Sequence, residues 1–387
     1  MAALVRAGDE VRAMAERIAT GEVPSERELC ETHLLAPLAG APHDPVHHAE
    51  GDPLVHTAMV VRELVGLDGF AALGADARVA LALAALLHDV AKPETAIENG
   101  TRVSHPNHAP RGARKARAAL HAAGLDAAVR ECAVSLCRRH MQPHHALARQ
   151  GDDIGLLRWL AAVSLEMPVR LLLLLATADA RGRRPGRSDD AIALLHDFAA
   201  DHDLLDPCFP FTDRHARLSC CRGGTRDPRF ATQVPEEGAL VSVLSGLPGS
   251  GKSTRARELE ACGAVRISVE ELIHAGLDRG TAVQRAKETL REALRQGRDA
   301  VWDATMITRA PRRQIASLAE GYGARVRMLA LEVPLGERAR RVAVRGTDVP
   351  EKVLVNMLRS WELPTYDEAL IVEGRPERVC GVETVSR

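Results

Sequence analysis

The stretch GLPGSGKST, Gly246 to Thr254, follows a short apolar run and precedes a segment with helical spacing. It fits the pattern G-x-x-x-x-G-K-[ST], whose glycines let backbone N–H groups approach phosphate oxygens where a helix begins. In this pattern Lys252 is expected to reach the β- and γ-phosphates, and Ser253 to ligate Mg²⁺. The stretch therefore predicts a phosphate-binding loop for ATP. The expected nucleotide-binding residues are Gly246, Gly249, Ser250, Gly251, Lys252, Ser253 and Thr254.

The segments around this loop alternate between two sequence patterns, one typical of strands and one typical of helices. Short apolar or β-branched runs occur at residues 240–244, 264–268, 299–304 and 324–333, and helical spacing separates them. Strands that alternate with helices form parallel sheets with helical layers. The second half of the chain is therefore predicted to be an α/β domain with a parallel sheet.

Charged residues stand at the ends of these predicted elements. Glu270 follows the second predicted strand and Asp303 ends the third, where strand ends converge on a ligand crevice. Both are predicted to act on an acceptor hydroxyl or on the metal, with a solvated helix start as the alternative for Glu270 and its neighbour Glu271. Arg341 and Arg345 are four residues apart on a helical pattern, so they share a face that could neutralise a transferring phosphoryl group. A solvated basic face is the alternative for that pair.

Residues from about 50 to 200 have apolar positions at three- and four-residue spacing, which predicts an all-helical domain. One such run, AALLHDVAKP from Ala84 to Pro93, ends in an imidazole beside a carboxylate. Buried polar groups of this kind cost free energy unless something occupies them. Similar runs are interrupted by His and Asp upstream and downstream, and this ligand set suits Mn²⁺, Fe²⁺, Co²⁺, Ni²⁺ or Zn²⁺. The predicted ligands of one or two ions are His56, His88, Asp89, His108, His140 and Asp179.

Other polar residues in this half have several interpretations. The His-Asp dipeptide of His88-Asp89 occurs again at His196-Asp197, where no lysine follows it. This second pair is predicted to face solvent. Glu50 and Asp52 could ligate a metal, support a ligand or belong to a loop. The remaining histidines of this half that stand in pairs are predicted to be surface residues, with a contact to substrate as the alternative: His47, His48, His144 and His145.

Composition bounds the class of protein. The chain has 387 residues, of which 46% are hydrophobic and 27% charged, enough for two or three domains with real cores. No apolar run approaches the roughly 20 residues of a membrane span. The N-terminus lacks the apolar core of a secretory peptide, and the 8 cysteines have no metal-ribbon or disulfide spacing. These features predict a cytoplasmic protein with reduced thiols and no membrane partner.

Charge and aromatic content bear on anionic ligands. The net charge of -1 does not indicate a nucleic-acid binder, and few aromatic residues (Trp 3, Tyr 2, Phe 5) argue against a stacking platform for single strands. Between Arg309 and Arg345, however, nine arginines stand against three glutamates. This segment predicts an anionic ligand, and a nucleic acid would be held mainly through its phosphates.

From Val241 to about Ala369 the chain resembles the kinase domain of the polynucleotide 5′-kinase family, a P-loop phosphotransferase fold. The resemblance is carried by the phosphate-binding loop, by DAT at 303–305 and by RRVAVRGTDVP at 340–350. It implies that Glu270 is the general base for a 5′-hydroxyl. The family has an aspartate there, followed three residues later by an arginine that holds the acceptor's phosphate. This chain has Glu270 and Ile273, and Met306 replaces an asparagine that the family often has.

The order of histidines and aspartates in the helical half resembles the HD-domain phosphohydrolase superfamily, a helical metal-dependent phosphoesterase fold. Lys92 stands where that superfamily commonly has a lysine facing the substrate phosphate. The stretches HDVAKP, NHAPRGARKA and LLLLATADARGR resemble the HD module of bacterial tRNA nucleotidyltransferases and of HD-polynucleotide kinase proteins. The second group has the same domain order over about residues 49–369.

This resemblance implies an RNA end-healing enzyme. Its helical half would remove a 2′,3′-cyclic phosphate, a 2′-phosphate or a 3′-phosphate, and its kinase half would phosphorylate a 5′-hydroxyl with ATP and Mg²⁺. An RNA ligase would act after it. Two alternatives stay open: a phosphohydrolase and kinase pair for small molecules, which Ile273 keeps possible, and a regulatory protein in which bound ATP only signals. Steep salt dependence of RNA binding would separate the first alternative from an RNA enzyme. ATP turnover that did not depend on Glu270 would favour the second alternative, the regulatory protein.

The expected domain organisation follows from these patterns. Residues 1–48 form a helical segment without an assigned function, and 49–204 form the HD-type domain. Residues 205–238, rich in proline and glycine, form an irregular connector in which a short strand could occur. Residues 239–387 form the kinase domain.

Overall fold

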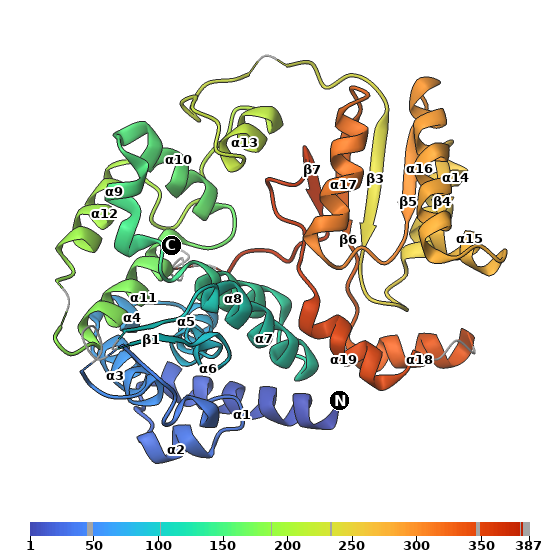
Figure 1. Ribbon diagram of the computed structural model, residues 1–387. Helices are drawn as coiled ribbons and strands as arrows, with labels where there is room; N and C mark the ends of the chain where they lie inside the picture. Colours follow the sequence, from blue (N-terminus) through green and yellow to red (C-terminus); the bar gives the residue numbers. More distant parts are fainter. Residues whose placement is uncertain are drawn as a thin grey trace, which may run out of the picture. The chain divides into compact units, whose positions relative to one another are not determined.

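The computed structural model describes residues 1–387 except 45–48, 101, 187, 233, 346–348, 380 and 382–387, and of Arg345 it describes the backbone only. The chain divides into two compact units (Figure 1). The first comprises Met1–Pro210 together with the segment that begins at Pro376, and the second comprises Phe211–Arg375.

The first unit is mainly helical, as the sequence predicts, and it is organised around α5. All residues from Ala80 to Lys92 are buried, and α5 packs against α1, α3, α8 and α11. The N-terminal residues belong to this unit, because α1 also packs against α7. The helices are α1 Ala2–Ala19, α2 Glu26–Glu31, η1 Ala36–Leu38, α3 Pro53–Val65, α4 Asp68–Ala71, α5 Ala75–Leu87, α6 Lys92–Thr95, α7 His108–Ala122, α8 Ala127–Arg139, η2 Pro143–His145, α9 Ala146–Gln150, α10 Asp153–Ser164, α11 Val169–Arg181 and α12 Asp190–Asp201.

An antiparallel hairpin interrupts the helices of this unit, which the prediction of an all-helical half missed. Its strands are β1 Ile97–Asn99 and β2 Arg102–Ser104. Gly100 lies in the turn with φ of +63°, a conformation that glycine adopts without strain. Each strand has only three residues, and most of them are exposed. The sequence therefore has no alternation of apolar and polar residues from which these strands could be predicted.

The second unit contains a five-stranded parallel sheet in the order β4-β5-β3-β6-β7. The four predicted strands are confirmed, and β7, only three residues long, was not predicted. The strands are β3 Leu240–Ser245, β4 Val265–Ser268, β5 Ala300–Asp303, β6 Arg325–Ala330 and β7 Ile371–Glu373. The helices are α13 Arg214–Cys221, α14 Lys252–Ala261, α15 Val269–His274, α16 Arg279–Arg295, α17 Arg309–Glu320, α18 Leu335–Arg345 and α19 Glu351–Ser360.

Helices cover both faces of this sheet (Figure 1). On one face, α16 and α17 contribute to the same apolar cluster as the side chains of Val241, Trp302 and Met328. On the other face, α14 packs with Leu244 and Val301. Because β5 lies beside β3, the residues that end these two strands meet at one edge of the sheet.

Part of the predicted connector is a helix. Asp213 caps α13, since its carboxylate accepts hydrogen bonds from the backbone N–H of Ala216 at 2.6 Å and of Thr232 at 2.7 Å. Ala216 and Cys220 are the buried residues of α13. The prolines and glycines that suggested an irregular segment flank this helix and do not interrupt it. No strand occurs in the described part of 205–238.

Among the described residues, no single helix has the length and apolar character needed to cross a membrane. The pair α10 and α11 would meet both criteria only if taken together, and the chain bends by 103° between them.

Candidate metal centre and nucleotide-binding site

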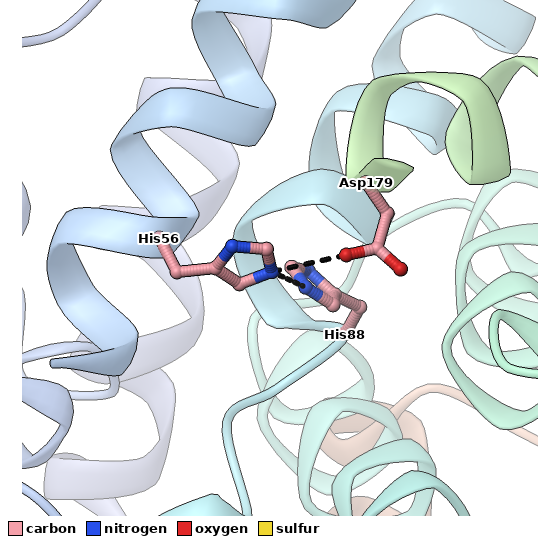
Figure 2. Close-up of side chains that lie close together, drawn as sticks. All are labelled: His56, His88 and Asp179. Carbon is pink, nitrogen blue, oxygen red and sulfur yellow. Dashed lines mark hydrogen bonds and ion pairs between the residues drawn. The ribbon is translucent and has the colours of Figure 1, made fainter. Parts of the chain in front are cut away.

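Three buried side chains from three helical segments converge in the first unit. His56 comes from α3, His88 follows α5, and Asp179 comes from α11 (Figure 2). The Nε2 atom of His56 lies 3.4 Å from Nε2 of His88 and 3.0 Å from Oδ1 of Asp179. One ligand atom from each residue lies within 4.8 Å of the others, so a single cation could bind all three.

A second group of three lies next to the first. His108 begins α7 and His140 follows α8, and their Nε2 atoms are 3.3 Å apart. Oδ1 of Asp89 lies 3.4 Å from Nε2 of His108 and 3.7 Å from Nε2 of His140. These atoms also lie within 4.8 Å of one another. The structure thus brings together all six residues that the sequence predicts as ligands.

Asp89 stands between the two groups. Its Oδ2 atom lies 3.2 Å from Nε2 of His88 and 3.7 Å from Nε2 of His56, while Oδ1 faces the second group. Oδ1 is fully buried and has no hydrogen-bond partner among the described residues. A buried carboxylate oxygen of this kind is costly unless a cation compensates it. The donor set therefore fits two divalent cations that share Asp89.

The four histidines are held in one tautomer. A carbonyl oxygen can only accept a hydrogen bond, so each Nδ1 atom next to one carries the proton and leaves Nε2 with its lone pair. The carbonyl acceptors are Gly182 for His56 at 3.0 Å, Ala85 for His88 at 2.9 Å, His105 for His108 at 2.7 Å and Cys137 for His140 at 2.8 Å. The Nε2 atoms of all four thereby face the ligand groups, where Nε2 of His56 also lies 3.0 Å from Oδ1 of Asp179.

Several supporting residues surround Asp179 and His56. Arg183 donates to both carboxylate oxygens of Asp179, at 2.8 and 2.7 Å, and Nε2 of His144 lies 2.8 Å from Oδ2. The prediction that His144 is a surface residue was wrong, because its side chain is only 2% exposed. Sequence reasoning also missed Arg183, although its spacing of four residues from Asp179 was a usable signal. The Oε1 atom of Glu50 lies 3.3 Å from Nδ1 of His56.

The structure decides between the alternatives that the sequence left open for the neighbouring residues. Glu50 lies behind His56 and supports it. Asp52 caps α3, because its Oδ1 atom accepts hydrogen bonds from the N–H groups of Leu54 and Val55 at 2.9 and 3.0 Å. His196-Asp197 faces solvent as predicted, with side chains 46% and 77% exposed. His47 and His48 lie outside the described residues.

Lys92 adds a buried positive charge to the centre. Its Nζ atom lies 2.7 Å from Oδ2 of Asp89 and 2.8 Å from Nε2 of His43. His43 belongs to the N-terminal segment, for which the sequence predicted no function. That segment therefore contributes one side chain to the surroundings of the predicted ligands.

The electrostatics keep Asp89, Asp179 and His140 in the protonation states that metal binding requires, whereas the pKa of His56 is shifted the other way. Burial acts to raise the pKa of Asp89, but Lys92 and His88 outweigh it and hold that pKa well below its usual range. Burial also acts to raise the pKa of Asp179. Arg183 and His144 outweigh this effect and hold the pKa of Asp179 well below its usual range. For His140, burial and the neighbouring His88 lower the pKa to about 3, so its imidazole stays neutral. At His56, burial acts to lower the pKa, but hydrogen bonds to Asp179 and Glu50 leave it raised.

In the second unit, the loop after β3 has the geometry of a phosphate cradle. Gly249 and Gly251 have φ of +85° and +99°, and a Cβ atom at Gly246 would lie 2.3 Å from the carbonyl oxygen of Leu331. Only glycine suits these positions without strain. The Nζ atom of Lys252 donates to the carbonyl oxygens of Gly246 and Leu247, both at 3.0 Å, so the lysine lies over the loop.

The acids predicted at the strand ends have different surroundings. Ser253 donates from Oγ to Oδ1 of Asp303 at 3.4 Å, the pairing by which P-loop proteins hold Mg²⁺. Glu270 is exposed and lines a pocket with Lys252, Ser253 and the loop glycines. Glu271 instead forms an ion pair with Arg266 at 2.6 Å.

Helix α18 lies against this loop. A Cβ atom at Gly251 would be 3.6 Å from Nη1 of Arg341, and Val342 lines the same pocket. Arg341 also donates from Nε to Glu337 at 2.8 Å. The structure therefore places Arg341 beside the loop. The side chain of Arg345 and residues 346–348 of the same segment lie outside the described residues.

The arginine-rich segment 309–345 does not gather at one place. Arg312 is buried and binds the carboxylate of Glu368 at 2.7 and 2.9 Å, and Arg309 binds Asp367. Arg327 donates to the hydroxyl of Ser242 on the neighbouring strand. Most of the local positive excess is thus used within the second unit.

Comparisons with known proteins agree with this division. Residues 241–364 match the family model described as "AAA domain". The chain is 36% identical over 215 residues to the "Multifunctional CCA protein" of Halorhodospira halophila, covering 55% of this chain and 48% of that protein. Proteins of the same name from Alkalilimnicola ehrlichii and Thioalkalivibrio sulfidiphilus are 34% identical over 147 residues and 32% over 165, covering 38% and 41% of this chain.

The chain spans 48%, 33% and 38% of the lengths of these three relatives, less than half of each. The family match, the parallel sheet and the loop geometry together show that the second unit is a P-loop kinase-like domain. Such a domain uses a nucleotide and Mg²⁺.

Proposed function

We propose that the chain is a bifunctional RNA end-healing enzyme. Its helical unit would be an HD-type, metal-dependent 2′,3′-phosphoesterase, and its α/β unit an ATP-dependent 5′-hydroxyl polynucleotide kinase. The observation that carries the proposal is one chain with two adjacent ligand groups, between which Asp89 lies, and a P-loop pocket lined by Glu270. Similarity to proteins named multifunctional CCA protein supports an enzyme with RNA-related activities.

In the phosphoesterase, divalent ions would lower the pKa of a water molecule and offset the charge of the substrate phosphate. The protein's own residues would prepare that centre. The backbone carbonyls behind the four histidines fix their Nε2 lone pairs toward the ligand groups. Lys92, 2.7 Å from Asp89, would supply a positive charge to the phosphate.

In the kinase, the backbone of the loop and Lys252 would hold the triphosphate, and Ser253 with Asp303 would hold Mg²⁺. Glu270 would accept the proton of the 5′-hydroxyl as the hydroxyl oxygen attacks the γ-phosphorus, while the bond from that phosphorus to the β,γ-bridging oxygen breaks and ADP leaves. Arg341, which lies beside Gly251, would offset charge on the transferring group, and Arg345 is proposed for the same task.

The test is mass spectrometry of both ends of a short RNA with a 5′-hydroxyl and a 2′,3′-cyclic phosphate. The RNA is incubated with protein, ATP, Mg²⁺ and Mn²⁺, and each metal is then omitted in turn. We expect a gained 5′-phosphate and an opened or lost terminal phosphate. Such RNA ends would be the substrate of an RNA ligase. An RNA with both ends unchanged would refute the proposal.

A small-molecule pair is the second candidate function. It is favoured by Ile273, which replaces the arginine that the kinase family uses for the acceptor's phosphate. Ile273 is partly buried and packs against the apolar cluster of the sheet, so it offers no charge to an acceptor. Consumption of ATP without any change in the RNA would favour this candidate.

A further inference from the structure

Helix α16 carries a row of basic residues along one side. Lys287, Arg291 and Arg295 are spaced four residues apart, and each step advances about 6 Å along the helix axis. The neighbouring side of α16 is apolar and buried, with Ala286 and Leu290 in the core of the second unit. The three cations therefore form a line beside this buried side, with Lys287 and Arg291 half-buried and Arg295 exposed.

A groove lies between α16 and α17, which cover the same face of the sheet. Lys287 and Arg291 line it from α16, and Arg313 and Ser317 line it from α17. We call this the α16–α17 groove. It is an open surface groove with three positive charges along its walls.

An aromatic side chain stands beside the last cation of the row. Tyr322 follows α17 and is 40% exposed. The guanidinium of Arg295 lies 6.0 Å from the centre of its ring, and Nη2 lies 3.5 Å from the hydroxyl. An exposed ring backed by a cation can stack a nucleobase.

The fold itself uses little of this charge. The side chains of Lys287 and Arg313 form no hydrogen bond or ion pair with any described residue. Arg291 pairs with Glu288 at 2.5 Å, the one ion pair formed by these four cations in the part of the chain that the structure describes. Lys287 and Arg313 therefore present positive charge that an external anion could bind.

The two helices that line the groove run between the two edges of the sheet. Helix α17 starts six residues after Asp303, so its first turn lies toward the edge that carries the phosphate-binding loop, and Arg313 lies about one turn further along. Arg295 ends α16 shortly before β5 begins, and Tyr322 precedes β6, so both lie at the opposite edge. The cations of the groove thus lie between the first turn of α17 and Tyr322.

We propose that the α16–α17 groove binds the sugar–phosphate backbone of the RNA strand whose 5′-hydroxyl enters the kinase pocket. This inference rests on the proposed function. A row of separated cations suits a polyanion with repeated charges, whereas a single small phosphate needs converging donors. The aromatic ring at the far end fits a single-stranded nucleic acid better than an anionic lipid surface.

The test compares two variants that each lose three positive charges. The groove variant carries Lys287→Gln, Arg291→Gln and Arg313→Gln. The control carries Arg279→Gln, Arg285→Gln and Arg298→Gln, at exposed positions outside the groove lining. Each is assayed with a 20-nucleotide 5′-hydroxyl RNA and with a nucleoside 3′-phosphate as acceptor, over a range of salt concentrations. Thermal unfolding checks that both variants fold.

For the groove variant we expect the KM for the long RNA to rise on the order of tenfold. The slope of log KM against log salt should become shallower by about 2, since each lost phosphate contact removes about 0.7. The KM values for ATP and for the nucleoside 3′-phosphate should not change. A groove variant with the KM and slope of the control would overturn the inference.

Direct binding separates this inference from the proposed function. Fluorescence anisotropy with the same RNA needs no catalysis, so weaker binding by the groove variant alone would support the groove even if no RNA were phosphorylated. Wild-type protein that binds no RNA would overturn it. A groove variant that loses binding to vesicles of anionic lipid but keeps RNA binding would assign the surface to a membrane, and would also overturn it.

Discussion

The two carboxylate oxygens of Asp89 face different neighbours, so Asp89 lies beside both groups of metal-ligand candidates. Oδ2 faces His88 and Lys92, and Oδ1 faces His108 and His140. An amide at this position would keep the volume but lose the negative charge and one acceptor oxygen. Both ligand groups would then lose the anion that they share.

We therefore predict that Asp89→Asn abolishes phosphoesterase activity and removes bound transition metal. Activity on a 2′,3′-cyclic phosphate and metal content by mass spectrometry are the measurements. The matched control is Asp197→Asn in the solvent-facing His-Asp pair, which should keep both. Equal metal content in the two variants would contradict the shared-ligand geometry.

Glu270 and Glu271 offer a comparison of adjacent carboxylates. Glu270 lines the pocket of the phosphate-binding loop, whereas Glu271 pairs with Arg266. If Glu270 accepts the hydroxyl proton, Glu270→Gln should lower the kinase kcat by about 10²–10⁴-fold. Glu271→Gln should leave it within a few-fold of wild type. Phosphate transfer from labelled ATP to a 5′-hydroxyl RNA measures both, and equal losses would remove the base role from Glu270.

His56, His88, Asp89 and Asp179 could be predicted because they interrupt apolar helical patterns, a signal that is local in sequence. His108 and His140 lie in polar stretches and were predicted as further histidines between them in the chain. The residues that support these ligands could not be predicted in this way. His43 and His144 come from short irregular or 3₁₀ segments, and they reach Lys92 and Asp179 through contacts 49 and 35 residues apart in the chain. Sequence spacing carries no information about such contacts, whereas a helical spacing of four, as for Arg183, does.

At the scale of elements, α18 is the helix that meets the phosphate-binding loop. Arg341 on this helix lies next to Gly251, whereas its neighbour Arg340 is exposed, and both bind Glu337. Arg341→Ala should therefore lower kcat by about 10²-fold or more, because positive charge at the transferring group is lost. Arg340→Ala removes the same charge and the same kind of ion pair. Steady-state kinase assays should show it close to wild type, and a loss as large as that of Arg341→Ala would contradict a specific contact.

The strands of the second unit were predictable because parallel strands in a covered sheet are continuous apolar runs. The elements that were missed are short or shaped by neighbours. β1, β2 and β7 have three residues each, too few for any period. Helix α13 was hidden by the prolines and glycines on both sides of it, and its start depends on Asp213, which also binds Thr232.

At the scale of the whole molecule, each compact unit contains one complete set of candidate site residues. All six metal-ligand candidates and Lys92 belong to the first unit, and the phosphate-binding loop, Glu270 and Arg341 belong to the second. No side chain in either described set comes from the other unit. The two activities should therefore be chemically separable, even though one chain carries both.

We predict that His88→Ala abolishes phosphoesterase activity and leaves the kinase kcat and KM unchanged, because His88 lies among the ligands of the first unit. Lys252→Ala should do the reverse, since it removes the cation that lies over the phosphate-binding loop. Both activities are measured on one RNA with both reactive ends, with circular dichroism to verify folding. If a folded variant lost both activities, the two sites would have to act as one, and the assignment of one reaction to each unit would fall.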